Sequence, residues 1–186
     1  EIDRCAAFLL GLGIGPGDVV TIQIPNRIEF PVVFFSLELI GAIANKISPD
    51  FRRREVEYIL RFSGSKGYVC ASNFKGFDYP AMIGELRHTL PDLACVVVCG
   101  ETSVSNVHSL EQGLRQAAPI SATERVHMDP DTIMRMAFTS GTTGDPKGVM
   151  HSYRTMAWGV SSATRRFTMT SADRYISYLP LAHVAE

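Results

Sequence analysis

Segments that favour helices alternate with segments that favour strands along most of this 186-residue chain. Short β-branched runs between turn residues predict strands, and longer runs with apolar residues three and four apart predict helices. Alternation at these lengths is typical of crossover units, in which helices cover both faces of a mostly parallel sheet. The pattern therefore predicts an α/β fold with a largely parallel sheet covered by helices.

The expected elements can be placed by residue number. Strands are expected at residues 19–24, 42–47, 67–71, 94–99, 133–138 and 148–151, and helices at residues 1–12, 53–62, 81–89 and 107–116. Another helix is expected after Asn26, because Asn26 and Glu29 have the spacing of a capping box. Its apolar face would carry Phe30, Val33, Phe34, Leu37 and Gly41. Met156, Trp158 and Val160 are expected to belong to a helix and to the core.

Composition excludes several classes of protein. The chain is 46% hydrophobic with a formal net charge of −1, which fits a folded domain and not a disordered segment. This charge gives no reason to expect nucleic acid or an anionic membrane as a partner. The longest apolar stretch, from Phe30 to Ala44, is too short for a transmembrane segment, which needs about 20 apolar residues. The chain begins within an expected helix, and its last residues show no pattern that ends a domain. We therefore expect a piece of a longer protein.

Four cysteines, at positions 5, 70, 95 and 99, raise the possibility of a metal site or a disulfide. Cys95 and Cys99 bracket a Val-Val-Val run that is typical of a strand. In a strand their Cα atoms would lie about 13 Å apart, too far for a disulfide. We therefore expect buried structural thiols and a reducing, cytoplasmic location.

The most unusual segment is Thr139-Ser140-Gly141-Thr142-Thr143-Gly144-Asp145-Pro146-Lys147-Gly148-Val149. Glycines let backbone N–H groups approach a ligand, hydroxyls donate to phosphate oxygens, and the lysine adds a positive charge. Because Pro146 precedes the lysine and Gly148 follows it, the segment does not fit the mononucleotide loop of kinases and GTPases. Between two expected strands, it predicts a hairpin loop that binds phosphate, although composition alone also permits a flexible polar hairpin.

The segment closely resembles the loop of the adenylate-forming (ANL) superfamily of AMP-dependent acyl-CoA synthetases and ligases, which reads Ser/Thr-Gly-Thr-Thr-Gly-x-Pro-Lys-Gly. Further similar motifs are Gly15-Pro16-Gly17-Asp18, Pro25-Asn26, Gly41-Ala42, Ser48-Pro49 and Leu179-Pro180-Leu181-Ala182-His183. The resemblance covers essentially the whole chain. It implies that residues 1–186 are part of the large N-terminal ATP- and acyl-binding domain, without the C-terminal domain.

The resemblance also implies a reaction. A carboxylate attacks the α-phosphate of ATP to give an acyl-adenylate, and the thiol of coenzyme A then takes the acyl group. The residues that would wrap the β- and γ-phosphates are Ser140, Gly141, Thr142, Thr143 and Gly144. Lys147 would neutralise charge, Thr139 would contribute a hydroxyl to Mg²⁺, and His183 would stand near the acyl pocket.

Other parts of the family's active site would follow residue 186, including the mobile domain with its catalytic lysine, so no catalytic residue is expected within the chain. Arg52, Arg53 and Arg54, at a helix start, are expected to be solvated. The acid could be fatty, alicyclic or aromatic, and a homodimer of the full-length protein is left open. The alternative is a non-catalytic nucleotide-binding or interaction module that ends near residue 186.

Overall fold

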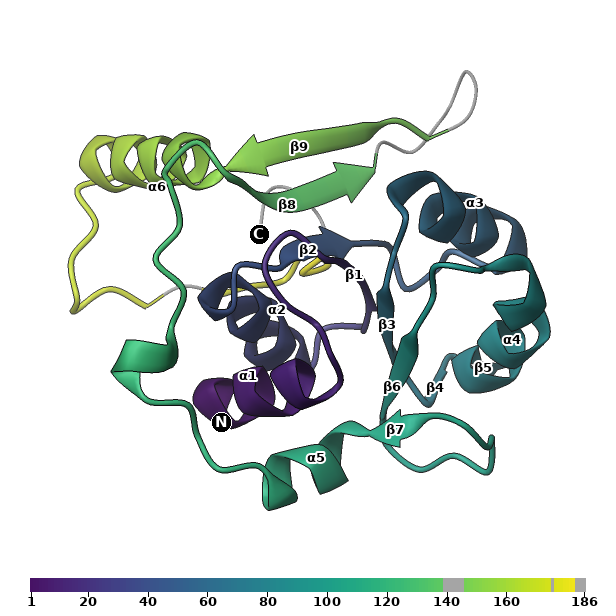
Figure 1. Ribbon diagram of the computed structural model, residues 1–186. Coiled ribbons are helices and arrows are strands. Elements are labelled where there is room, and N and C mark those ends of the chain that lie inside the picture. The colour runs from purple at the N-terminus through teal and green to yellow at the C-terminus, as the bar shows by residue number, and fades with distance from the viewer. Residues whose placement is uncertain (139–145, 175, 183–186) are drawn as a thin grey trace.

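The computed structural model describes residues 1–138, 146–174 and 176–182, and in these residues helices alternate with strands (Figure 1). The strands of the main sheet are β1 (Val19–Gln23), β2 (Ile43–Lys46), β3 (Gly67–Ala71), β6 (Cys95–Cys99), β7 (His108–Ser109), β8 (Ile133–Phe138) and β9 (Gly148–Ser152). Their spatial order is β7-β6-β3-β1-β2-β8-β9. Neighbouring strands pair in parallel apart from β8 and β9, which form an antiparallel hairpin. The predicted fold class is confirmed.

Helices cover both faces of this sheet. They are α1 (Ile2–Gly11), α2 (Glu29–Leu39), α3 (Arg53–Ser63), α4 (Tyr79–Leu86), α5 (Leu110–Gln116) and α6 (Tyr153–Arg166), with 3₁₀ turns at Arg87–Thr89 and Ala122–Glu124. One hydrophobic core joins the sheet to α1, α2 and α5, and a second joins it to α3 and α4. Successive strand side chains alternate between them: Val69 lies in the first core, and Tyr68 and Cys70 lie in the second.

Two short strand pairings were not expected. β7 occupies the start of the segment predicted as a helix at 107–116, and β4 (Asn73–Phe74) pairs with β5 (Phe77–Asp78) in a small separate hairpin. Strands of two residues are too short to show an alternating pattern, so sequence periodicity cannot find them. The helix expected at 81–89 begins earlier, at Tyr79, because the Asp78 carboxylate caps it by accepting from the Ala81 N–H.

The start and the end of α2 differ from the prediction. The helix begins at Glu29 after Ile28, and Asn26 does not cap it. At its other end, Gly41 lies beyond the helix with a φ of +71°, and the Ala42 N–H bonds back to the Leu37 carbonyl. Gly41 therefore ends the helix in the left-handed region and does not extend its apolar face. The other predicted members of that face (Phe30, Val33, Phe34 and Leu37) are buried as expected.

The prediction that α6 belongs to the core is wrong. Trp158 is 74% exposed, Val160 is 62% exposed, and no residue of α6 is buried. The helix leaves the sheet after its edge strand β9 and runs away from both cores (Figure 1). The apolar side chains of α6 therefore lie at the surface of this part of the protein.

The four cysteines are buried and free, as predicted. Cys95 and Cys99 both lie in β6, within an extended strand that keeps them apart. Burial raises the pKa of the Cys5 thiol to about 11 and raises the pKa of the Cys99 thiol further still. Among the described residues, no helix combines the length and the apolar character that crossing a membrane requires.

Candidate functional site

The glycine-rich segment connects β8 to β9, at the edge of the sheet. The last paired residues of this hairpin are Phe138 and Gly148, so the two strands bring the ends of the segment together. The predicted phosphate-binding residues Thr139, Ser140, Gly141, Thr142, Thr143 and Gly144 lie outside the described residues. Lys147 is described and exposed, one residue before β9. The structure therefore confirms the two flanking strands and provides an exposed ammonium group at the end of the segment.

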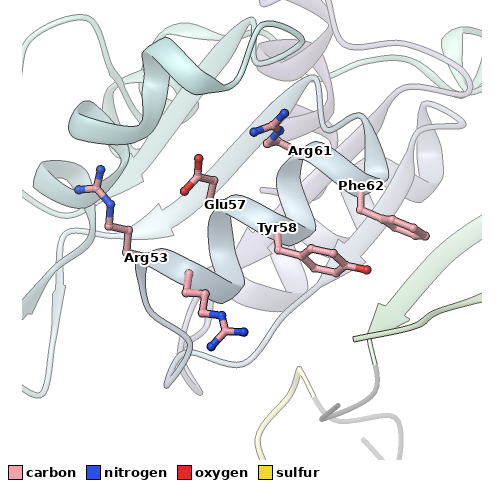
Figure 2. A pocket seen from close by; sticks show the side chains of 6 residues that line it. Arg53, Glu57, Tyr58, Arg61 and Phe62 are labelled. Atoms are coloured by element: carbon pink, nitrogen blue, oxygen red, sulfur yellow. The ribbon is translucent and has the colours of Figure 1, made fainter. Parts of the chain in front are cut away.

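Helix α3 supports the base of this hairpin. The Tyr58 hydroxyl donates a hydrogen bond of 3.3 Å to the carbonyl of Pro146, immediately before Lys147. Phe62 stacks on Tyr58 with ring centroids 5.7 Å apart and meets Phe138 edge-on at 6.0 Å. These contacts join one turn of α3 to both ends of the segment, and Figure 2 shows the two rings on the same side of the helix.

An open depression of about 760 Å³ lies along the outer side of α3 (Figure 2). It is lined by Arg53, Arg54, Glu57, Tyr58, Arg61 and Phe62. Arg53 pairs with Glu85 at 2.5 Å, whereas Arg54 and Arg61 have no ion-pair partner in the described part of the chain. The depression thus combines two exposed guanidinium groups with an aromatic pair, a combination suited to an anionic ligand with a planar group.

The arginine run at the start of α3 is divided between two environments. Arg53 and Arg54 are exposed, as expected. Arg52 instead donates to the carbonyls of Pro49 and Phe51, and its guanidinium lies 4.2 Å from the centroid of the Phe77 ring. Arg52 is therefore a structural contact that fixes the loop after β2, and the prediction of a solvated side chain does not hold for it.

A half-buried ion pair holds β8 against α2. The Arg135 guanidinium lies 2.9 Å from the Glu38 carboxylate, and each side chain is 15% exposed. Arg135 also lies over the ring of Phe34, and the Tyr153 hydroxyl donates to the Glu38 carbonyl. Burial raises the pKa of Glu38 above its ordinary value, although Arg135 and Lys46 oppose that shift.

The segment that leads to His183 is held by side chains from the far end of the sequence. The Asn26 side chain donates to the Leu179 carbonyl at 2.7 Å and accepts from the Leu181 N–H at 2.8 Å. Lys46 donates to the Leu181 carbonyl at 3.3 Å. His183 itself lies outside the described residues. Asn26, expected to cap a helix, thus contacts a chain segment more than 150 residues away.

The expected magnesium ligand, Thr139, is also outside the described residues. Residues 1–138, 146–174 and 176–182 contain no group of three or more His, Cys, Asp or Glu side chains arranged to hold a metal ion. Lys147 is the predicted site residue that the structure places, and an exposed ammonium group is suitable for binding phosphate. The contacts of Tyr58 and Lys46 were not predicted from the sequence, because no local motif marks either residue.

Comparison with known proteins assigns the chain to a class. The family of AMP-binding enzymes matches residues 1–186, and the chain belongs to this family. This is the adenylate-forming superfamily of acyl-CoA and aryl ligases that the loop resembled.

The relatives include ligases for two kinds of acid. A vibriobactin-specific 2,3-dihydroxybenzoate-AMP ligase of Vibrio cholerae is 32% identical over 98% of this chain and 33% of its own length. A long-chain-fatty-acid–CoA ligase of Mycobacterium tuberculosis is 33% identical over 98% of this chain and 34% of its own length. The chain therefore spans about a third of the length of these curated relatives.

Solved structures agree on the fold. The apo structure of MbtA from Mycobacterium smegmatis superposes with a TM-score of 0.88 at 29% identity, over 98% of this chain and 33% of the other. An anthranilate CoA ligase in complex with anthranoyl-AMP superposes with a TM-score of 0.75 at 28% identity, over 82% of this chain and 28% of the other.

Proposed function

We propose that residues 1–186 form part of the N-terminal domain of an AMP-forming carboxylate ligase, and that a C-terminal domain follows them in the full-length protein. In the first step a carboxylate oxygen attacks the α-phosphorus of ATP and the bond to the bridging oxygen breaks. The products are an acyl-adenylate and pyrophosphate. In the second step the thiol of coenzyme A attacks the acyl carbon, AMP leaves, and the thiol proton passes to solvent.

The observation that carries this proposal is the family match over the whole chain, together with the loop between β8 and β9 that ends in Lys147. Backbone N–H groups and hydroxyls of Ser140–Gly144 bind the β- and γ-phosphates. Lys147 offsets the negative charge that pyrophosphate carries as it leaves. Thr139 would contribute a hydroxyl to Mg²⁺, which would screen the phosphate charge when bound, and His183 would stand near the acyl pocket.

The depression on α3 supports coenzyme A as the acceptor. Its nucleotide carries several phosphate charges and a planar adenine, which match Arg54, Arg61 and the Tyr58–Phe62 ring pair. Replacing both Arg54 and Arg61 by Gln should raise KM for coenzyme A about tenfold and leave pyrophosphate release in the first step unchanged. An equal rise in KM for ATP would place the two arginines in the first step instead.

The acid is proposed only by class, as a fatty, alicyclic or aromatic carboxylate. The experiment that tests the function is to supply the full-length protein with ATP, Mg²⁺ and a panel of these acids and to measure pyrophosphate. Release that depends on one group of acids identifies the substrate. No release with any acid favours the alternative, a nucleotide-binding or interaction module.

The 186-residue chain alone should release no pyrophosphate under the same conditions. Catalysis requires contacts that tighten in the transition state, and the phosphate loop supplies only part of them. Steady turnover by residues 1–186 would show that the active site is complete within them, and the proposal of a partial domain would be wrong.

A further inference from the structure

The side chain of Asn26 binds the backbone on both sides of Pro180. Its amide nitrogen donates to the Leu179 carbonyl at 2.7 Å, and its amide oxygen accepts from the Leu181 N–H at 2.8 Å. A side-chain amide that both donates and accepts in this way fixes the position and the orientation of the peptide it contacts. Asn26 follows β1 by three residues, so the contact joins the carboxyl end of a central strand to residues 179–181.

Lys46 holds the same segment from the neighbouring strand. It is the last residue of β2, is only 5% exposed, and donates from Nζ to the Leu181 carbonyl at 3.3 Å. The N–H and the carbonyl of Leu181 are therefore bound by two different side chains. Leu181 and Ala182 also pack against the core formed by α1, α2 and the sheet.

This contact borders a depression at the carboxyl ends of the strands, which is where open α/β folds bind their ligands. A depression of about 360 Å³ lies beyond the carboxyl ends of β1, β2 and β3, and its lining includes Asn26, Tyr178 and Pro180. In open α/β sheets, ligand-binding crevices lie outside the carboxyl ends of the strands. The segment that Asn26 and Lys46 hold is therefore in a position to shape a binding crevice.

We propose that Asn26 and Lys46 are positioning residues for residues 179–181, of which Pro180 lines the depression beyond the carboxyl ends of β1, β2 and β3. The inference rests on the proposed function, because it takes this depression to be part of the site that binds the carboxylate. Errors of about 1 Å in the placement of groups that position a substrate can lower the rate of an enzyme by about 100-fold.

Hydrogen exchange tests the contact without any assay of activity. In the full-length protein, Asn26→Ala should increase amide exchange about tenfold or more in the peptide that contains Leu181, because its N–H loses its acceptor. Asn26→Asp retains an acceptor for that N–H and should keep the protection close to the parental value. Peptides from β3 and β6 should be unchanged in both variants, which excludes global unfolding. Unchanged exchange at Leu181 in Asn26→Ala would overturn the proposed contact.

Kinetics test the positioning. Asn26→Ala and Lys46→Met should each lower kcat/KM for the carboxylate about tenfold, with KM for ATP within about twofold of the parental value. The double variant should lose less than the product of the single effects, because both side chains act on one segment. Gln112→Ala, on the exposed side of α5, is the matched control and should change neither constant.

The outcomes separate this inference from the proposed function. Lost protection at Leu181 with unchanged carboxylate kinetics would overturn the positioning role. If the full-length protein adenylates no acid, the proposed function fails and the positioning role fails with it, while the exchange result still decides whether Asn26 holds residues 179–181.

Discussion

The guanidinium of Arg135 on β8 lies 2.9 Å from the carboxylate of Glu38 on α2, with both side chains largely removed from solvent. This ion pair connects the strand that leads into the glycine-rich segment to a helix of the main core. The Tyr153 hydroxyl, from the first residue of α6, binds the carbonyl of the same Glu38. One residue of α2 thus anchors the strand before the segment and the helix after the hairpin.

The burial of Glu38 should make stability depend on pH. Burial raises the pKa of Glu38 in the folded protein, so the folded state binds this proton more tightly than the unfolded state does. The resulting stabilisation is present below the unfolded pKa of 4.5 and is lost as pH rises through the higher folded pKa. Arg135→Met removes the cation that opposes this shift and should steepen the loss.

Urea unfolding of the 186-residue chain between pH 4 and pH 8 measures this effect. The free energy of unfolding of Arg135→Met should fall more steeply with pH than that of the parent. Combining Arg135→Met with Glu38→Gln should remove the extra slope and restore stability at neutral pH. Equal slopes in the parent and in Arg135→Met would show that the pair does not control the titration of Glu38.

Replacing Lys147 should slow adenylation in the full-length protein. Lys147→Ala removes a positive charge that the proposed mechanism uses to offset the charge of leaving pyrophosphate. One preorganised electrostatic contact of this kind is worth a few kcal/mol, so we expect a loss of about 10- to 1,000-fold in the rate of pyrophosphate release. Stability should be unaffected, because Lys147 is exposed. Arg125→Ala, which removes an exposed cation outside the loop, is the control, and a parental rate in Lys147→Ala would contradict the assigned role.

The exposed apolar side chains of α6 should make the 186-residue chain associate. Trp158 and Val160 on α6 lie mostly in solvent, and Phe167, just after the helix, is also exposed. Large apolar side chains that are exposed to solvent favour self-association. Trp158→Gln should weaken association measured by sedimentation and change the free energy of unfolding by less than about 0.5 kcal/mol, because the side chain is exposed. Trp158→Phe keeps an apolar group and should keep the association, so an equal loss in both variants would argue against an apolar contact.

The cysteines should resist modification while the protein is folded. All four are buried, and burial raises the pKa of each thiol, so little thiolate is present near neutral pH. Labelling with a thiol reagent at pH 7.5 should be at least about 100-fold slower in the native chain than in urea. Rapid labelling of one thiol in the native state would identify a local opening that the structure does not show.

Features that depend on local composition could be predicted from the sequence. The β-branched run at residues 19–24 predicted β1, and the spacing of Phe30, Val33, Phe34 and Leu37 predicted the buried side of α2, because both patterns repeat over adjacent residues. The glycine-rich segment was found in the same way, since its chemistry is contained in consecutive residues. The family resemblance rests on such local motifs as well.

Contacts between residues that are distant in the sequence could not be predicted, because they depend on how the chain folds. Asn26 has the spacing of a helix cap, yet its amide binds residues 179–181, because folding brings the end of β1 beside that segment. Trp158 is of a residue type that is usually buried, yet it is exposed, because α6 follows the edge strand and leaves both cores. Sequence patterns record the preference of each residue for burial or for a hydrogen bond, whereas the partner that satisfies it depends on the order of strands in the sheet.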